Sequence, residues 1–463
     1  MSRFAGKRVH FIGIGGAGMS GLARMLLDRG AVVTGSEPVP NEQTRRLAES
    51  GARITREQLG QLLCPDVHLV VRTAAVPDSN VELQIATRLG LKTVKYAQLL
   101  GEVMNEQVGV AVAGTHGKST TTAMIAHALL VCGMDPSFVI GGTVPQLGGS
   151  ARSGAGRVFV AEACEYDRSF HCLRPSIAVI TNIDTDHLDC YRDLEEIIAA
   201  FRRFARLVPP AGTIIAAAED HVAAALHVLD TPIQWCALET PADWTTRSLG
   251  VQEGCHSGLI LRQGEPVATL RLSIPGRHNL SNATLAVAAC CACGLDPQQA
   301  ADAISSFAGV DRRMTEIGRA GGVIVVDDYA HHPTEIRSTL EALREKYCPN
   351  RLICIFQPHQ ASRTRLLMDE FAASFARADL TILPEIYYVR DSEEDRRSVS
   401  SAELARRINR NGSSAVFCPS FAEVIEHLRP VLRGGDLVVT MGAGNVWEIG
   451  RQILSECEMR IAG

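Results

Sequence analysis

The fold is decided by the stretch Val108-Gly-Val-Ala-Val-Ala-Gly-Thr-His-Gly-Lys-Ser-Thr-Thr-Thr-Ala123. Its first six residues are apolar or small and predict a buried strand, and the residues from about Ser119 onward predict a helix. Gly114 and Gly117 lie between them and allow a tight turn whose backbone N–H groups point at an anion. Lys118 adds a positive charge for phosphates, and the Ser119 hydroxyl is placed to bind Mg²⁺. This order is typical of a phosphate-binding loop.

The loop is shorter than the standard pattern G-x-x-x-x-G-K-[ST], which would need glycine at position 112, where Val112 stands. The alternative interpretation is a glycine-rich turn between a strand and a helix that carries one lysine. The strand, the glycines, Lys118 and Ser119 follow the order that phosphate binding requires, so a phosphate loop is the favoured interpretation.

Composition limits the class of protein. The chain has 463 residues, of which 46% are hydrophobic and 21% charged, as in an ordinary soluble protein of about two to four domains. The 51 acidic and 46 basic side chains give a net charge of −5, which argues against nucleic acid as the main partner. No apolar run approaches the ~20 residues that span a bilayer, and the first residues lead into a glycine-rich loop rather than a signal-peptide core. We expect a cytoplasmic protein that binds small molecules, not a membrane, as a monomer or homodimer.

The 14 cysteines do not form a recognisable framework. Cys290, Cys291 and Cys293 lie in an expected helix over residues 282–293, and no second pair stands at a matching metal-ligand spacing. Most of the others lie in apolar segments. Buried, reduced thiols are therefore expected.

The N-terminal segment predicts a Rossmann-like unit. The strand expected at Arg8–Ile12 runs into Gly13, Gly15 and Gly18, which fit the pattern G-x-G-x-x-G. Glu37 follows 19 residues after the last of these glycines, at the end of the next expected strand. This context indicates a nucleotide or dinucleotide ligand, and the alternative is a glycine-rich turn chosen for close packing of helix on strand.

Two polar clusters follow apolar strands expected near residues 157–161 and 177–181. Their candidate ligand residues are Glu162, Asp184, Asp186, His187 and Asp189. Because the carboxyl ends of parallel strands share one edge of a sheet, these side chains are expected near the phosphates that Lys118 binds, where carboxylate oxygens suit Mg²⁺. The alternative is that Asp184 and Asp189 are helix N-caps.

The last segment alternates strands and helices most regularly. Strands are expected at 323–326, 352–356, 380–383, 415–418 and 437–440, and helices at 333–346, 364–377, 401–409, 421–428 and 446–456. Polar loops follow several of these strands and contain His331, His332, His359, Arg363 and Arg365. The whole pattern predicts an α/β fold of three domains, a Rossmann-like domain at 1–106, a central phosphate-loop domain with a mostly parallel sheet at 107–308, and a second Rossmann-like domain at 309–463.

These stretches together resemble the Mur ligases over nearly the whole chain. The resemblance is carried by His10-Phe-Ile-Gly-Ile-Gly-Gly-Ala-Gly-Met-Ser-Gly-Leu-Ala23, Gly114-Thr-His-Gly-Lys-Ser119, Glu162-Ala-Cys-Glu-Tyr-Asp167, Thr181-Asn-Ile-Asp-Thr-Asp-His187, Gly276-Arg-His-Asn-Leu-Ser-Asn282, Val326-Asp-Asp-Tyr-Ala-His-His-Pro333 and Phe356-Gln-Pro-His359. The family uses the short form of the phosphate loop, which accounts for Val112. The opening glycine loop and the Asp-Asp-Tyr-Ala-His-His-Pro stretch resemble most closely the members that act on UDP-N-acetylmuramate.

The resemblance implies a peptidoglycan-precursor ligase that uses ATP and Mg²⁺. The first domain would bind UDP-N-acetylmuramate, the second ATP and the third L-alanine. The sugar carboxylate would attack the γ-phosphate to give an acyl phosphate and ADP, and the amine of L-alanine would then displace phosphate.

The resemblance also implies roles for individual residues. Lys118, Glu162, His187 and Arg313 would be catalytic, and Ser119, Glu162 and His187 would bind Mg²⁺. ATP would be bound by Gly114, Thr115, His116, Gly117, Lys118, Ser119, Thr120, His278, Asn279, Arg313 and Asp328. The UDP-sugar would be bound by Gly13, Gly15, Gly16, Gly18, Met19, Ser20 and Glu37. The amino acid would be bound by Tyr329, His332 and Arg363.

Three alternatives stay open at the level of sequence. The first is a recycling ligase of the same family that adds a preformed tripeptide to UDP-N-acetylmuramate. The second is a non-catalytic nucleotide-binding regulator, which Cys164 and Gln360 favour because they depart from the family's pattern, as Ser150 also does. The third is an NAD-dependent oxidoreductase, which rests on the N-terminal glycines alone and leaves the phosphate loop unexplained.

Overall fold

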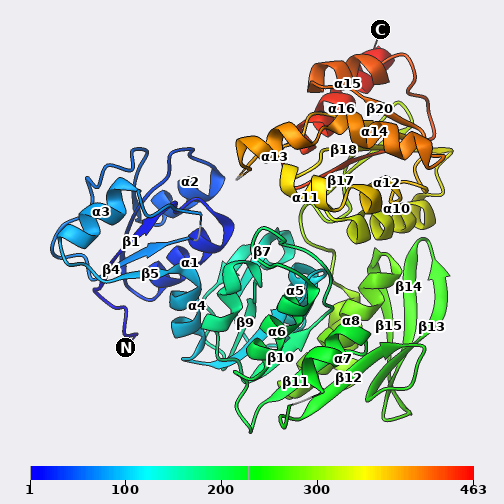
Figure 1. Ribbon diagram of the computed structural model, residues 1–463. Helices are drawn as coiled ribbons and strands as arrows, with labels where there is room; N and C mark the ends of the chain where they lie inside the picture. The colour runs from blue at the N-terminus through cyan, green and yellow to red at the C-terminus, as the bar shows by residue number, and fades with distance from the viewer. Residues whose placement is uncertain (1, 74, 228, 390, 463) are drawn as a thin grey trace.

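Three β-sheets follow one another along the chain in the computed structural model, which describes residues 2–73, 75–227, 229–389 and 391–462. Each sheet carries helices on its faces and belongs to a separate domain (Figure 1). The predicted α/β class is confirmed. In Figure 1 the middle domain, coloured cyan to green, lies between the blue N-terminal domain and the yellow-to-red C-terminal domain.

The N-terminal domain has a five-stranded sheet. Its strands are β1 (Arg8–Ile12), β2 (Val32–Ser36), β3 (Arg53–Thr55), β4 (Leu69–Arg72) and β5 (Thr93–Lys95). Its helices are α1 (Ala17–Asp28), α2 (Glu42–Glu49), α3 (Val81–Arg88) and α4 (Tyr96–Met104). All pairings are parallel, in the order β3-β2-β1-β4-β5, which is the Rossmann-like arrangement that the sequence predicts.

The middle domain has a ten-stranded sheet. Its strands are β6 (Val108–Ala113), β7 (Ser137–Val144), β8 (Gly149–Arg152), β9 (Val158–Glu162), β10 (Ile177–Ile180), β11 (Thr213–Ala217), β12 (Ile233–Leu238), β13 (Trp244–Gln252), β14 (Cys255–Arg262) and β15 (Glu265–Pro275). They lie in the order β15-β14-β13-β12-β11-β10-β6-β9-β7-β8, with antiparallel pairs only at the two ends. Because β6 lies between β10 and β9, the loops that follow these three strands meet at one edge.

Helices cover both faces of the middle sheet. They are α5 (Lys118–Val131), α6 (Leu194–Ala205), α7 (Asp220–Leu226), α8 (Arg277–Ala292) and α9 (Pro297–Ser305), with short 3₁₀ turns η1 (Pro145–Leu147) and η2 (Tyr166–Cys172). In α5 every residue from Ser119 to Leu129 is buried, as expected of a helix that is apolar or small on all sides. The first turn of α5 packs against α8, since a Cβ on Gly117 would lie 2.5 Å from the Asn282 side chain.

The C-terminal domain has a six-stranded sheet. Its strands are β16 (Thr315–Ala320), β17 (Val323–Asp328), β18 (Arg351–Phe356), β19 (Leu380–Leu383), β20 (Ala415–Phe417) and β21 (Asp436–Met441). Its helices are α10 (Pro333–Tyr347), α11 (Ala361–Leu366), α12 (Met368–Ala372), α13 (Glu393–Ser398), α14 (Ser401–Arg410), α15 (Phe421–Leu428) and α16 (Trp447–Ala462). The order is β16-β17-β21-β18-β19-β20, with only the β16 pairing antiparallel.

Most predicted elements are confirmed, two predictions needed correction, and one edge strand was missed. The single helix predicted over 364–377 is two short helices, α11 and α12, separated at Leu367. Helix α8 starts at Arg277, earlier than the helix expected over 282–293. The edge strand β16 was not predicted. Its residues alternate charged and apolar side chains too weakly for a strand pattern to stand out.

The domains pack against each other through different kinds of contact. Helix α4 shares an apolar core with η2, where Val103 and Phe170 belong to the same cluster and a Cβ on Gly101 would meet the Cys172 carbonyl. The C-terminal domain meets the middle domain through α10, whose Glu345 pairs with His256 of β14 at 2.8 Å. The contact between α4 and η2 is apolar and continuous, whereas the contact between α10 and β14 is polar. Polar contacts of this second kind are typical of domains that move relative to each other.

No helix within the described residues combines the length and the hydropathy that crossing a membrane requires.

Candidate active site

The loop after β6 has the backbone that an anion site needs. Gly114 and Gly117 have φ of +145° and +78°, and a Cβ on Gly114 would lie 1.9 Å from the Thr181 hydroxyl. The loop is fixed to the end of β10, because Asn182 accepts a hydrogen bond from the His116 N–H at 2.8 Å. No side chain caps the start of α5, so its first N–H groups are left for a ligand. The predicted phosphate loop therefore has the geometry of one.

Lys118 lies at the centre of this loop with 13% of its side chain exposed. Its ammonium donates to the carbonyls of Gly114 and Thr115 and pairs with Glu165 at 2.9 Å. Burial alone would lower the pKa of Lys118, but the charge and hydrogen bond of Glu165 together with the neighbouring Cys164 and Glu162 outweigh burial and raise the pKa above its usual value. Lys118 is therefore a fixed positive charge at the start of a helix, which is the charge that a bound phosphate requires.

Ser119 and Glu162 form a ready pair of oxygen ligands. The Ser119 hydroxyl donates to Glu162 Oε2 at 2.8 Å, and the same oxygen accepts from the Gly141 N–H at 2.8 Å. A hydroxyl and a carboxylate are hard donors that suit Mg²⁺ when water and phosphate oxygens complete its coordination. Glu162 is the last residue of β9, and Ser119 lies in the first turn of α5, which follows the neighbouring strand β6, so adjacent strands hold the pair in place. These residues fit the predicted magnesium site.

His187 lies beside Glu165, the carboxylate that pairs with Lys118. Its Nε2 lies 3.6 Å from Glu165 Oε1 and 3.8 Å from Asp186 Oδ2, and its backbone has φ of +54°. The unusual backbone directs the ring toward the lysine–carboxylate pair, where it also meets Tyr166 edge to face at 5.2 Å. The role of His187 as a second magnesium ligand stays a prediction.

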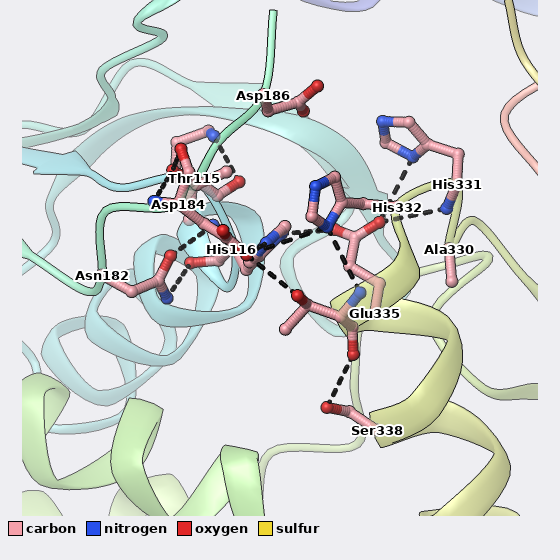
Figure 2. A network of polar contacts seen from close by, with 12 residues as sticks. Thr115, His116, Asn182, Asp184, Asp186, Ala330, His331, His332, Glu335 and Ser338 are labelled. Carbon is pink, nitrogen blue, oxygen red and sulfur yellow. Dashed lines mark hydrogen bonds and ion pairs between the residues drawn. The ribbon is translucent and has the colours of Figure 1, made fainter. Parts of the chain in front are cut away.

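A polar network joins the phosphate loop to the C-terminal domain (Figure 2). His116 Nε2 lies 3.1 Å from Asp184 Oδ2, and its Nδ1 lies 3.3 Å from Glu335 Oε1 at the start of α10. The Thr334 hydroxyl donates to Asp184 Oδ2 at 2.9 Å. Burial lowers the pKa of His116, but its two carboxylate partners outweigh burial and raise the pKa to about 9. The imidazolium thus bridges two domains.

Asp184 and Asp189 are not helix N-caps. The N-cap of α6 is Asp193, whose carboxylate accepts from the Glu196 N–H at 2.9 Å. Asp184 is used in the interdomain network instead, and Asp189 lines a small pocket beside Arg363. The capping alternative is therefore wrong for both residues.

One large cavity opens between the middle and C-terminal domains, with a volume of about 610 Å³, within the usual range for a small-molecule site. It is lined by these predicted ATP-site residues: His116, Gly117, Ser119, Thr120, His278, Asn279, Arg313 and Asp328. Gly114, Thr115 and Lys118 belong to the same segment between β6 and α5 but are not among the lining residues. Burial lowers the pKa of His278 to about 4, so this ring is neutral and suited to contact an aromatic base.

Arg313 and Asp328 are residues of the C-terminal domain that line this cavity. Arg313 lies over the Tyr329 ring at 5.1 Å and 3.8 Å from Glu335 Oε1, so its guanidinium is oriented from two sides. Asp328 is the last residue of β17 and accepts hydrogen bonds from the N–H groups of Met314 and Ala330 at 2.7 and 2.8 Å. Burial raises its pKa to about 6. Both predicted residues therefore line the nucleotide-sized cavity from the domain opposite the phosphate loop.

Arg363 lies in a second part of the same interface. Its Nε donates to Asp186 Oδ1 at 2.9 Å, and its Nη1 donates to the His359 carbonyl at 2.8 Å. Only 10% of the Arg363 side chain is exposed. Among the described residues Nη2 has no hydrogen-bond partner, which leaves donors for a ligand carboxylate. His332, also predicted here, instead donates from Nε2 to the Thr185 carbonyl at 3.0 Å.

The N-terminal glycine loop is held in place by the Glu37 carboxylate. Gly13 has φ of +76°, and the Gly15 N–H donates to the Glu37 carboxylate at 3.0 Å, so Glu37 shapes the loop. Met19 packs in the apolar core, while Ser20 lines a cavity of about 320 Å³ between this domain and the β8 region. Together with Gly16 and Gly18, these residues keep their UDP-sugar assignment as a prediction.

Sequence reasoning missed two carboxylates. Glu165 pairs with Lys118, and Glu335 orients both His116 and Arg313. Glu165 stands three residues after Glu162 in a cluster that had been singled out. Glu335 lies in the first turn of α10, where an acidic residue is ordinary because it favours the positive end of a helix. Because this ordinary role accounts for an acidic residue at that position, the sequence did not indicate that Glu335 contacts the other domain.

Comparison with known proteins follows the same division of the chain. Residues 8–108 match the model "Mur ligase family, catalytic domain", residues 112–290 match "Mur ligase middle domain", and residues 312–444 match "Mur ligase, glutamate ligase domain". The three matches together span most of the chain.

Individual relatives align from end to end. The UDP-N-acetylmuramate–L-alanine ligases of Caldanaerobacter subterraneus and Acetivibrio thermocellus are 42% and 41% identical, with coverage of at least 97% of this chain and of each relative. The solved structure of UDP-N-acetylmuramate-alanine ligase from Thermotoga maritima superposes with a TM-score of 0.82 at 26% identity, over 98% of this chain and 100% of that one. A murein peptide ligase from Psychrobacter arcticus gives 0.73 at 28% identity, over 98% and 99%. The chain belongs to the Mur ligase family.

Proposed function

We propose that this protein joins L-alanine to UDP-N-acetylmuramate and cleaves ATP to ADP and phosphate in doing so. The observation that carries the proposal is the single cavity lined by the phosphate loop on one side and by Arg313 and Asp328 on the other. The full-length relatives that carry this activity in their names support the choice of substrates. The reaction belongs to peptidoglycan precursor synthesis, and with it to cell-wall formation, cell shape and division, in the cytoplasm.

The first half of the reaction brings two anions together. An oxygen of the sugar carboxylate attacks the γ-phosphorus, and the bond from this phosphorus to the β–γ bridging oxygen breaks. The products of this step are an acyl phosphate and ADP, which is the leaving group. Lys118, the free N–H groups of α5 and Arg313 offset the repulsion and stabilise the charge on the transferring group. Ser119 and Glu162 would hold Mg²⁺, which neutralises charge on the phosphates.

The second half needs the amine close to the acyl carbon. Arg363 supplies a guanidinium for the carboxylate of L-alanine, with Tyr329 and His332 in the adjoining loop. The nitrogen attacks the acyl carbon, a proton leaves the amine, and phosphate departs. Asp186 and the His359 carbonyl fix Arg363, so the amino acid is positioned and not merely bound.

The proposed division of work follows the domains. Residues 1–106 bind the UDP-sugar, residues 107–308 bind ATP, and residues 309–463 bind the amino acid and complete the nucleotide site. His278 and Asn279 contact adenine and Asp328 contacts the ribose, since all three line the same cavity as the phosphate loop. His187, beside Glu165, would hold a second Mg²⁺. The molecule acts as a monomer or homodimer.

The decisive experiment measures phosphate release with UDP-N-acetylmuramate, ATP and Mg²⁺ and one amine at a time. L-alanine should give the highest kcat/KM, above glycine and L-serine and above the tripeptide L-Ala-γ-D-Glu-diaminopimelate. Faster release with the tripeptide would identify the recycling ligase instead. Release that does not depend on any of these amines would contradict ligase activity.

Replacing Glu162 with glutamine should raise the Mg²⁺ concentration needed for half-maximal turnover by about tenfold or more, because losing a ligand's charge weakens a hard-cation site. Glutamine keeps the size of the side chain and an oxygen for the Gly141 N–H, so the fold should be retained. The measurement is turnover against Mg²⁺ at fixed ATP. Glu219→Gln, on the same cavity but away from Ser119, is the matched control. An unchanged Mg²⁺ dependence in Glu162→Gln would remove this residue from the metal site.

A further inference from the structure

Three ligating side chains converge at the junction of the middle and C-terminal domains, apart from the Ser119–Glu162 pair. They are His116 of the phosphate loop, Asp184 after β10 and His332 before α10. One ligand atom from each lies within 4.8 Å of the others. His116 Nε2 is 3.1 Å and His332 Nδ1 is 3.9 Å from Asp184 Oδ2. Among the described side chains, this is the group of His, Cys, Asp and Glu residues that has metal-ligand spacing.

In both histidines, the ring nitrogen that faces away from Asp184 has a polar partner that fixes the orientation of the ring. His332 Nε2 donates to the Thr185 carbonyl at 3.0 Å, so this nitrogen carries the proton, and Nδ1, which accepts from the Thr334 N–H at 3.3 Å, keeps a lone pair 3.9 Å from Asp184 Oδ2. His116 directs Nδ1 at the Glu335 carboxylate, 3.3 Å away, and Nε2 at Asp184 (Figure 2). A carbonyl or carboxylate behind each ring is the arrangement that fixes metal-binding histidines.

The burial of the cluster is also suited to a metal. His332 is 4% exposed, and the side chains of His116 and Asp184 are 15% and 34% exposed, so one side of the cluster opens to the nucleotide cavity. Thr334 Oγ1, 2.9 Å from Asp184 Oδ2, adds an oxygen at the same point. Two imidazoles, a carboxylate and an open side match a four-coordinate site that completes its shell with water.

We propose that His116, Asp184 and His332 form a binding site for a divalent transition-metal ion such as Zn²⁺. Imidazole nitrogens favour Zn²⁺ and Co²⁺, whereas the oxygen pair at Ser119 and Glu162 favours Mg²⁺, so the two sites separate the two classes of cation by ligand type. The ion displaces the proton between His116 and Asp184 and the weak hydrogen bond from the Thr334 N–H to His332 Nδ1.

The site spans two domains, which gives the ion a structural effect. His116 belongs to the phosphate loop, and His332 belongs to the C-terminal domain. An ion bound to both fixes the distance between the two domains, whereas the nucleotide must enter the cavity that His116 and Asp184 line. Zn²⁺ should therefore hold the two domains together and raise the Tm of the protein in the absence of any substrate.

The experiment uses the full chain with Co²⁺ alone, in the presence of excess Mg²⁺ to fill the oxygen site. Wild-type protein should show the visible d–d absorption of a nitrogen-containing, low-coordinate Co²⁺ site at one equivalent, and Zn²⁺ should remove it. His332→Gln and Asp184→Asn should each weaken Co²⁺ binding at least about tenfold. The same variants should lose the rise in Tm with Zn²⁺.

Two controls separate this site from others. His256→Gln, at the other His–carboxylate pair of the same domain interface, should bind Co²⁺ like the wild type. Glu162→Gln should also retain it. Loss of the signal in Glu162→Gln, or an unchanged signal in His332→Gln and Asp184→Asn, would overturn the proposal. No UDP-sugar, ATP or turnover is involved, so this result is independent of whether the proposed ligase activity is found.

Discussion

Lys118→Ala is expected to lower the rate of ADP formation by about 10²–10³-fold, the usual cost of losing a preorganised charge that acts on the transition state. Lys118 is held by two loop carbonyls and Glu165, so its ammonium is in place before the phosphates arrive. Alanine removes the charge without replacing it. The measurement is single-turnover ADP formation with saturating ATP and UDP-N-acetylmuramate, which isolates the phosphoryl step from release of products.

The loss of Lys118 also affects stability through its partner Glu165, and a second substitution at Glu165 gives a control for this effect. Its side chain is 3% exposed, so removing Lys118 leaves a buried carboxylate without its main cation, which destabilises a protein by about 3–5 kcal/mol. Lys118→Met combined with Glu165→Gln removes both charges and keeps the volume. The double variant should fold with a Tm near that of Glu165→Gln and remain inactive. Lys92→Ala, at an exposed lysine, should be fully active. Near-normal ADP formation in a folded Lys118 variant would refute the role.

The local parts of the site were predictable from sequence because they follow from chain order. A strand, two glycines, Lys118 and Ser119 dictate a loop whose geometry depends on neighbours in sequence. Glu162 could be placed near the phosphates that Lys118 binds because it ends a strand that is parallel to β6 in the same sheet. The rule that ligands bind at the carboxyl ends of such strands was enough for this step.

The contacts between domains were not predictable in the same way. Nothing in the sequence links Glu335 to His116, since 219 positions separate them and the contact depends on how α10 docks on the middle domain. Arg363 was expected to face a ligand, and its pairing with Asp186 across 177 positions was not foreseen. Helix periodicity also failed at Leu367, where α11 ends and α12 begins, because apolar residues on both sides continue the same pattern.

Replacing Arg363 with lysine should raise the KM for L-alanine by about 10–100-fold. The physical reason is that a charge-assisted, two-point contact with the carboxylate contributes about 1.5–3 kcal/mol to binding, and the variant loses this contact. Lysine keeps the positive charge that Asp186 needs but cannot present two parallel donors. The KM for ATP should change much less, since the phosphate loop and Arg313 bind the nucleotide. Steady-state kinetics with each substrate varied in turn give both values.

The choice of lysine is set by stability. Arg363→Ala would leave Asp186, whose side chain is 7% exposed, without its partner in the protein interior. The arginine lowers the pKa of Asp186 well below its usual value against the opposing effect of burial, so that carboxylate stays charged at any working pH. Arg365→Lys, two residues away and paired with Asp395 at an exposed position, is the matched control and should keep the KM for L-alanine. An unchanged KM in Arg363→Lys, or an equal rise in the two variants, would place the amino-acid carboxylate elsewhere in the interface.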